Sequence, residues 1–228
     1  MSQSGPNASR WICLDVGETL IDETRVWIEW ARLLDIPAFT FVAAIGSTIG
    51  RTNDHQDAFN LVHRPDWRSL LPAFRSRYVG FKAEDLYPDA LQALEGLRAA
   101  GYHTAVIGNQ PAERTAELLA LGVDADVMAM SAEMGFSKPD PAFFRQALRL
   151  MGDPDPSQVA YVGDRLDNDV RPAVAAGLRA IWLRRGPWGV IGDADGPPAE
   201  TALSVDSLEE LVRRVDEAWA GPAPTADG

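Results

Sequence analysis

The chain of 228 residues is long enough to bury one substantial core, and its hydrophobic content of 46% is typical of a globular domain. The formal net charge of −12 disfavours broad nucleic-acid binding and adhesion to anionic membranes, because both need a basic surface. The first ten residues lack an apolar signal segment, and no stretch reaches transmembrane length. We therefore expect a cytoplasmic protein without nucleic-acid or membrane partners.

The first predicted strand covers residues 11–14 and runs directly into an acidic loop. Asp15 ends this strand and opens the segment Asp15-Val16-Gly17-Glu18-Thr19-Leu20. A carboxylate at the end of a buried strand, followed by a glycine turn and a threonine, is typical of a positioned nucleophile or metal ligand. The single cysteine, Cys13, lies within the strand, so we expect a buried structural thiol and no internal disulfide.

The segment 22–86 shows helical periodicity without a clear strand. The helices predicted in it cover residues 23–34, 39–49, 56–62 and 67–79. We expect a small all-helical domain, inserted directly after the first strand and lying over the edge of a sheet. Trp27, Trp30 and Trp67 fall at helical spacing, which favours the interior of this domain over a substrate-binding surface.

After the insert, short apolar runs alternate with helical patterns. The predicted strands cover residues 104–107, 126–130, 159–162 and 180–183, and the helices 111–121, 141–151, 168–176 and 208–219. Leu91, Leu94 and Leu97 mark a further helix that leads into this part of the chain. Strands separated by helices predict right-handed crossovers and a doubly wound parallel sheet, which is a Rossmann-like α/β fold.

These patterns predict two domains and two flexible ends. The α/β core comprises residues 10–21 and 87–220, and the helical domain comprises residues 22–86. Residues 1–9 and 221–228 are small, polar and rich in proline and glycine, so we expect them to be flexible.

Polar residues follow several of the predicted strands at their carboxyl ends. Ligands bind in the crevice outside these ends in an open parallel sheet, so the polar groups are expected to meet in one site. The set comprises Asp15, Thr19, Gly108, Asn109, Ser137, Lys138, Asp164 and Asp169. Its carboxylates, cation and amide suit a divalent metal and a phosphate group. The three histidines lack metal-ligand spacing, which argues against a zinc site.

The same residues carry a family resemblance. The motifs are Asp15-x-Gly17-x-Thr19-Leu20, Ile107-Gly108-Asn109, Lys138-Pro139-Asp140-Pro141 and Gly163-Asp164-x-x-x-Asn168-Asp169. In this order they resemble the motifs of the haloacid dehalogenase (HAD) superfamily of hydrolases. The helical insert resembles the cap of that superfamily's subfamily I. The resemblance covers nearly the whole of residues 10–185.

The resemblance implies a magnesium-dependent phosphatase that acts on a small phosphorylated molecule. Asp15 would be the nucleophile that forms an aspartyl-phosphate intermediate, and Lys138 would neutralise charge between it and the phosphoryl oxygens. Mg²⁺ would be held by Asp15, the backbone carbonyl of Gly17 and Asp164, with Asp169 nearby.

The remaining motif residues would contact the substrate or support the site. Thr19 would fix the nucleophile loop, and Gly108 and Asn109 would offer N–H and amide groups to the phosphoryl group. Each of these roles is implied by the resemblance alone.

Two glycines depart from the phosphatases of this superfamily. Gly17 replaces the aspartate that protonates the leaving alcohol and activates water, and such an acid/base is worth about 10²- to 10⁴-fold in rate. Gly108 replaces a serine or threonine that would hydrogen-bond the phosphoryl group. The neighbouring Glu18 is expected to point elsewhere. We therefore expect weak turnover.

Several alternatives stay open at this point. One is a protein that binds phosphate or a metabolite without turning it over, and another is a structural partner protein. Dehalogenases of the superfamily carry an aromatic residue at position 17 and use no metal, which fits this chain poorly. Phosphonatases use a cap lysine, and besides Lys138 the chain has only Lys82, at the far end of the insert. The sequence leaves the substrate and the oligomeric state undetermined.

Overall fold

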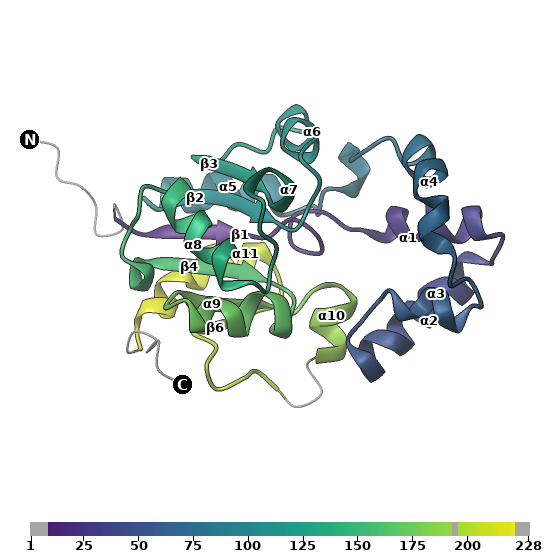
Figure 1. Cartoon of the computed structure of the whole chain (residues 1–228). Coiled ribbons are helices and arrows are strands. Elements are labelled where there is room, and N and C mark those ends of the chain that lie inside the picture. Colours follow the sequence, from purple (N-terminus) through teal and green to yellow (C-terminus); the bar gives the residue numbers. More distant parts are fainter. Residues whose placement is uncertain (1–8, 193–195, 222–228) are drawn as a thin grey trace, which may run out of the picture.

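The centre of the molecule is a six-stranded parallel sheet with the strand order β3-β2-β1-β4-β5-β6. The strands are Trp11–Leu14 (β1), His103–Gly108 (β2), Val127–Met130 (β3), Val159–Gly163 (β4), Arg179–Leu183 (β5) and Leu203–Val205 (β6). The structure is a computed structural model that describes residues 9–192 and 196–221. It confirms the predicted doubly wound sheet (Figure 1). The predicted flexible ends lie outside the described residues, apart from residues 9 and 221.

Helices cover both faces of this sheet. Ile12 and Leu14 of β1 join the hydrophobic cluster on one face, whereas Cys13 between them joins the cluster on the other. The first face is covered by α5 (Ala90–Ala99), α6 (Arg114–Ala120) and α11 (Leu208–Arg214), and the second by α8 (Pro141–Leu150) and α9 (Arg171–Ala175). Burial on both faces explains why the strands are near-continuous apolar runs. Burial also raises the pKa of the Cys13 thiol, so this cysteine is a buried, protonated core residue, as expected.

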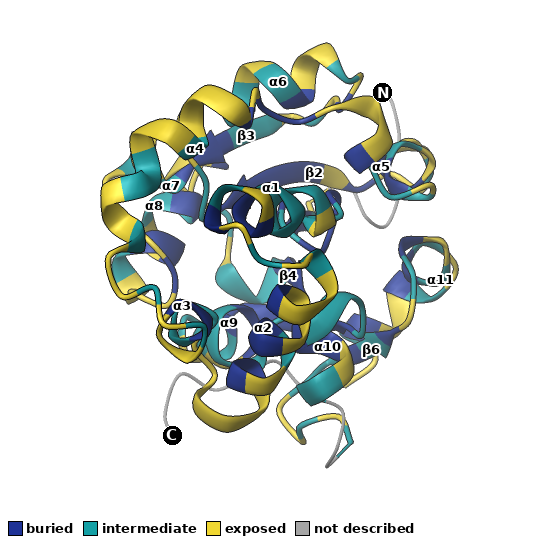
Figure 2. Cartoon of the chain, turned by 90° about the vertical axis from the view of Figure 1, so that its right-hand side faces the viewer, coloured by how far each residue is buried: buried dark blue, intermediate teal, exposed yellow. Residues whose placement is uncertain are grey.

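The helices that follow β1 build a hydrophobic cluster of their own. They are α1 (Thr24–Leu34), α2 (Ala38–Thr52), α3 (Asp57–Leu61) and α4 (Leu71–Arg77), with a 3₁₀ turn at Trp67–Leu70. The ring of Trp30 stacks on Phe74 at 4.4 Å and meets Trp67 edge to face at 5.7 Å, so both tryptophans lie inside the insert, as predicted. These helices lie beyond the carboxyl ends of the strands (Figure 1). Seen from that side, α4 forms part of the exposed outer surface (Figure 2).

One core helix packs against this insert. Helix α10 (Gly186–Ile191) contributes Trp188 to the cluster of the insert, where Ile191 also packs. Within the described residues, no single helix combines the length and apolar character needed to cross a membrane. Only α1 and α2 taken together do, and they are bent by 116° relative to each other.

Several elements differ from the sequence-based expectations. Strand β6, helix α10 and helix α7 (Ser131–Met134) are too short for their patterns to stand out. The predicted helix 208–219 is α-helical only to Arg214 and continues as a 3₁₀ turn at Val215–Trp219. The predicted helix 168–176 begins earlier, with a π-type turn at Leu166–Val170. The backbone N–H groups of Asp169 and Val170 both donate to the carbonyl of Arg165, which turns Asp169 inward.

Candidate active site

The candidate site lies where the strand order reverses, between β1 and β4. Leu14 of β1 pairs with Val162 of β4 on one side and with Val106 of β2 on the other. The backbone N–H of Asp15 donates to the carbonyl of Val162 at 2.9 Å, which extends the pairing one residue beyond β1. The loops after β1, β2 and β4 therefore leave the sheet at the same edge, where open α/β sheets bind their ligands.

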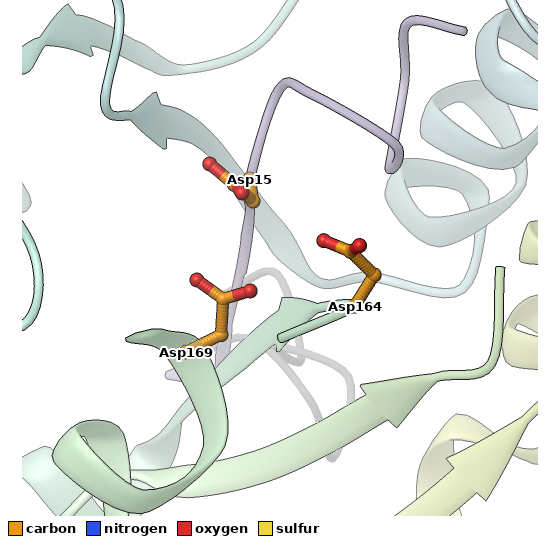
Figure 3. Close-up of side chains that lie close together, drawn as sticks. All are labelled: Asp15, Asp164 and Asp169. Atoms are coloured by element: carbon orange, nitrogen blue, oxygen red, sulfur yellow. The ribbon is translucent and has the colours of Figure 1, made fainter. Parts of the chain in front are cut away.

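Three carboxylates from two of these loops meet at this edge. Asp15, Asp164 and Asp169 each offer an oxygen, and these oxygens all lie within 4.8 Å of one another (Figure 3). All three residues are buried. Burial, reinforced by the charges of Asp169 and Asp15, raises the pKa of Asp164 well above its usual range. Burial likewise raises the pKa of Asp169 to about 6. Such a group needs a positive partner to stay ionised.

Lys138 supplies one positive partner from the loop after β3. Its Nζ lies 2.8 Å from Oδ1 of Asp15 and 2.6 Å from Oδ1 of Asp169. Burial alone would lower the pKa of this ammonium, but the two carboxylates outweigh burial and raise it. Lys138 therefore stays charged between Asp15 and Asp169.

Asn109 holds the Lys138 loop in place. Its Oδ1 accepts from the backbone N–H of Lys138 at 2.8 Å, and its Nδ2 donates to the Lys138 carbonyl at 2.9 Å. These bonds occupy both ends of the amide that the resemblance assigned to the substrate. Asn109 nevertheless lines the cavity above the carboxylates. Thr19, which was expected to contact the substrate or to fix the nucleophile loop, is fully buried and does not line this cavity.

The carboxylates differ in how their oxygens are used. Oδ1 of Asp169 accepts from Lys138, and Oδ2 accepts from the backbone N–H of Arg165 at 2.9 Å. Oδ2 of Asp164 is buried and has no hydrogen-bond partner in the described part of the chain. A buried, unpartnered carboxylate oxygen beside a second carboxylate suits a hard divalent cation such as Mg²⁺. The donor set thus fits a metal held by Asp15 and Asp164, with Asp169 bound to Lys138.

Glu23 fills the space beside Gly17, which sequence reasoning did not anticipate. A β-carbon at position 17 would lie 2.7 Å from Oε1 of Glu23. Burial, followed by the charge of Glu18, raises the pKa of Glu23 to about 7. A carboxyl group with such a pKa can both donate and accept a proton near neutrality. No motif marks Glu23, because only the angle at which α1 leaves the nucleophile loop brings it here.

Glu18 has a structural role in this loop. Its backbone adopts a positive φ of 52°, and its side chain is buried. Oε2 accepts from the Tyr87 hydroxyl at 2.6 Å, and Oε1 accepts from the backbone N–H of Glu23 at 3.1 Å. Glu18 is among the residues that line the cavity, but protein donors already occupy both of its oxygens, in keeping with the expectation that its carboxylate points elsewhere.

Gly108 leaves room for the carboxylate of Asp15. A β-carbon at position 108 would lie 2.5 Å from Oδ1 of Asp15 and 3.2 Å from the backbone nitrogen of Val16. Gly108 therefore does more than omit a hydroxyl group. A serine here would displace the Asp15 carboxylate from the place it occupies.

A cavity of about 320 Å³ opens above the carboxylates. Its walls include Trp27 and His55 from the insert and Trp188 from α10, and His55 meets the two indole rings edge to face at 5.3 and 5.5 Å. Trp27 packs against the cluster of the insert, as expected, and also lines the cavity. Arg165 also lines the cavity, stacks on Trp188 at 4.9 Å and pairs with Asp167 at 2.7 Å. The cavity therefore joins a charged floor to aromatic walls.

Comparisons with known proteins agree with this architecture. A family model described as haloacid dehalogenase-like hydrolase matches residues 10–177. A glyceraldehyde 3-phosphate phosphatase of Methanopyrus kandleri is 36% identical over 137 residues, which are 58% of this chain and 57% of the relative. A phosphoserine phosphatase of Thermus thermophilus is 35% identical over 150 residues, which are 63% and 55% of the two chains. The chain thus spans little more than half the length of these relatives.

A solved structure extends the similarity to nearly the whole fold. The crystal structure of a HAD phosphatase from Thermococcus onnurineus superposes with a TM-score of 0.59 at 22% identity. The match covers 90% of this chain and 97% of the other. At this level of identity, the superposition shows a shared fold.

Proposed function

The chain belongs to the haloacid dehalogenase-like hydrolases, and from this premise we propose that it hydrolyses a small phosphorylated molecule through an aspartyl-phosphate intermediate. The observation that carries the proposal is the buried cluster in which Lys138 pairs with Asp15. Beside this pair lies Oδ2 of Asp164, which has no hydrogen-bond partner among the described residues. Relatives named as phosphatases of glyceraldehyde 3-phosphate and phosphoserine support a small phosphomonoester as substrate. A cavity of about 320 Å³ has the size for such a molecule.

The chain's own residues supply the nucleophile and its environment. An oxygen of Asp15 attacks phosphorus from the end of β1, and the ammonium of Lys138, which pairs with Oδ1 of this carboxylate, holds it in place. Asp169 holds Lys138 from the opposite side. Mg²⁺, held by Asp15, Asp164 and the backbone carbonyl of Gly17, would neutralise charge on the phosphoryl oxygens when bound.

We propose that residues 22–86 act as a cap over this cavity. The cap carries Trp27 and His55 to the wall that faces Asp15, so it would exclude water and contact the part of the substrate beyond the phosphate. Most of its buried residues share one hydrophobic cluster, which Trp188 of α10 also joins, and this supports treating the insert as a domain. The α/β core would then comprise residues 10–21 and 87–220.

A second candidate is a protein that binds a phosphorylated metabolite without hydrolysing it. The observation in its favour is the pair of glycines, Gly17 and Gly108, at positions where phosphatases of the family carry an acid and a hydroxyl. A phosphonatase has less support. Half of the Lys82 side chain is exposed, Lys82 lies 3.7 Å from Glu84, and it does not line the cavity.

The test is a phosphatase assay on the purified chain with Mg²⁺ and a panel of phosphomonoesters. The panel includes p-nitrophenyl phosphate, glyceraldehyde 3-phosphate and phosphoserine, and Asp15→Asn serves as the inactive control. We expect phosphate release by the wild type only. Binding of beryllium fluoride, a phosphoryl mimic, without any turnover would favour the second candidate. Neither turnover nor binding of the mimic would contradict both.

A further inference from the structure

Glu23 stands where a side chain on Gly17 would enter the site. A β-carbon at position 17 would lie 2.7 Å from Oε1 of Glu23 and 2.9 Å from its Cδ. Gly17 and Glu23 line the same cavity as Asp15. The glycine thus leaves a space in the cavity that Asp15 also lines, and the carboxyl group of Glu23, the residue before α1, fills that space.

Two hydrogen bonds hold Glu23 in this position. Nε2 of Gln110 donates to its Oε1 at 3.1 Å, from the loop after β2. The backbone N–H of Glu23 donates to Oε1 of Glu18 at 3.1 Å, from the nucleophile loop. Glu18 is itself fixed by the Tyr87 hydroxyl. The two loops that flank Asp15 therefore position the carboxyl group of Glu23 relative to the nucleophile.

We propose that Glu23 is the catalytic acid and base of this chain, in place of the carboxyl group that position 17 lacks; the inference rests on the proposed phosphatase function. In the first step an oxygen of Asp15 bonds to phosphorus, the bond between phosphorus and the leaving oxygen breaks, and the proton of Glu23 passes to that oxygen. An alcohol leaves, Asp15 carries the phosphoryl group, and Glu23 is ionised.

The second step returns both residues to their starting states. Glu23 takes a proton from a water molecule whose oxygen bonds to phosphorus, while the bond between phosphorus and Asp15 breaks. Inorganic phosphate leaves, Asp15 is again a carboxylate, and Glu23 is again protonated.

Glu18 does not fit this role, although it is the acidic residue next to Gly17 in sequence. Both of its oxygens accept from fixed protein donors, the Tyr87 hydroxyl and the Glu23 N–H. Glu18 therefore acts as a positioning residue for Glu23.

The geometry also predicts how an acid restored at position 17 behaves. In Gly17→Asp the new β-carbon overlaps the carboxyl group of Glu23, so the two acids compete for one space. In the double variant Gly17→Asp/Glu23→Ala that space is free for the aspartate. The single variant is therefore not expected to gain activity over the wild type, whereas the double variant is expected to regain activity lost in Glu23→Ala.

The experiment compares Glu23→Gln with the wild type on two substrates that differ in their need for an acid. Glutamine keeps the shape and an oxygen for Gln110 but carries no transferable acid proton. Glu29→Gln, in the helix that follows Glu23, is the control, because Glu29 pairs with Arg32 away from the cavity. The substrates are p-nitrophenyl phosphate, whose leaving group needs little protonation, and the alkyl phosphomonoester that the wild type hydrolyses fastest in the panel.

We expect Glu23→Gln to lower turnover of the alkyl ester by about 10²- to 10⁴-fold. With p-nitrophenyl phosphate, it should release one equivalent of nitrophenolate in a rapid burst and then stall, because the phosphoryl-enzyme is no longer hydrolysed. Acid quenching should recover that phosphoryl group on the protein. A role confined to folding would lower both the burst and the later rate, and it would not be relieved in Gly17→Asp/Glu23→Ala.

Two results overturn the inference alone. The first is an alkyl-ester rate in Glu23→Gln within about threefold of the wild type, well short of the loss of an acid/base. The second is a wild type that hydrolyses the aryl ester but no alkyl ester. A wild type that neither turns over p-nitrophenyl phosphate nor forms a phosphoryl-enzyme overturns the proposed function, and the inference with it.

Discussion

Nζ of Lys138 lies 2.8 Å from Oδ1 of Asp15, and this ion pair joins the loop after β3 to the end of β1. The same ammonium lies 2.6 Å from Asp169, so one cation serves two buried carboxylates. Coulomb attraction is strong in this buried setting, and the cost of burying the charges is high as well. The site therefore depends on keeping all three charges together.

Lys138→Met should destabilise the fold as well as abolish activity. The variant leaves Asp15 and Asp169 buried without their partner, and breaking a buried pair in this way costs about 3–5 kcal/mol. Urea unfolding at pH 7 without added metal measures the loss. Lys82→Met is the matched control, because Lys82 is half exposed and should change the free energy of unfolding by less than about 0.5 kcal/mol. Equal stabilities for the two variants would contradict the importance of the ion pair.

Gly108→Ala should lower activity by displacing the nucleophile. The added β-carbon would lie 2.5 Å from Oδ1 of Asp15, so the carboxylate must rotate away from Lys138. We expect a fall in kcat of at least about tenfold, since small misplacements of reacting groups can cost far more. Gly46→Ala, within α2, is the control.

The control tests whether an added methyl group is harmful in general. At position 46 the new β-carbon would lie 3.9 Å from Cδ1 of Ile191, the nearest atom outside α2, which is ordinary contact. Replacing a helical glycine by alanine there should stabilise the fold by about 0.5–1 kcal/mol and leave kcat unchanged. An unaltered kcat in Gly108→Ala would show that Asp15 tolerates the methyl group.

Mg²⁺ should stabilise the wild type but not Asp164→Asn. A ligand that binds only the folded state at a hundred times its Kd adds about 2.7 kcal/mol to the free energy of unfolding. Oδ2 of Asp164 has no hydrogen-bond partner in the residues that the structure describes, and asparagine removes the negative charge that would bind the metal there. Thermal unfolding with Mg²⁺ and with a chelator measures the effect.

Asp167→Asn is the control for metal binding, because Asp167 pairs with Arg165 and lies outside the carboxylate cluster. This variant should keep the full response to Mg²⁺. An equal response in Asp164→Asn would place the metal elsewhere.

The fold was predictable because its strands are buried on both faces. Continuous apolar runs such as residues 11–14 and 159–162 are typical of strands in the interior of a parallel sheet. Parallel strands bring the residues that follow them to one edge of the sheet. Asp15 and Asp164 come together because they follow the neighbouring strands β1 and β4. Lys138 lies farther from its strand, β3, and reaches them because Asn109 holds its loop in place. Strand β6 was not predicted, because its three residues are too few to show a periodic pattern.

The cavity walls were not predictable in the same way. Trp27, His55 and Glu23 reach the site only because the helices of the insert pack at particular angles to the sheet, and sequence periodicity does not encode those angles. Gly17 shows the consequence most clearly. In the sequence, Gly17 means only that the acid expected at this position is absent. In the fold, the missing side chain leaves room for Glu23, which lies six residues along the chain.

His55 should make the protein less stable as the pH falls below about 6.5, the pKa of an unperturbed histidine. Burial, followed by the charge of Arg165, lowers the pKa of His55 in the folded state. Between this lowered value and 6.5 the unfolded chain binds a proton that the folded chain does not. The free energy of unfolding therefore falls as the pH falls through this window, by at most about 1.4 kcal/mol per pH unit for one proton.

The contribution of His55 can be isolated by comparing variants, because Asp164, Asp169 and Glu23 titrate with raised pKa values and oppose it. His55→Phe keeps a ring between Trp27 and Trp188 and removes the titrating group. Urea unfolding is measured at pH 7.5, 6.5 and 5.5, a range that brackets the histidine pKa of about 6.5. As the pH falls, the free energy of unfolding should decrease less in His55→Phe than in the wild type. His63→Asn, at an exposed position with a positive φ that asparagine tolerates, should follow the wild type. If the free energy of unfolding changed with pH in the same way in the wild type and in His55→Phe, His55 would bind its proton equally well in the folded and unfolded states. The insert would then leave His55 open to water.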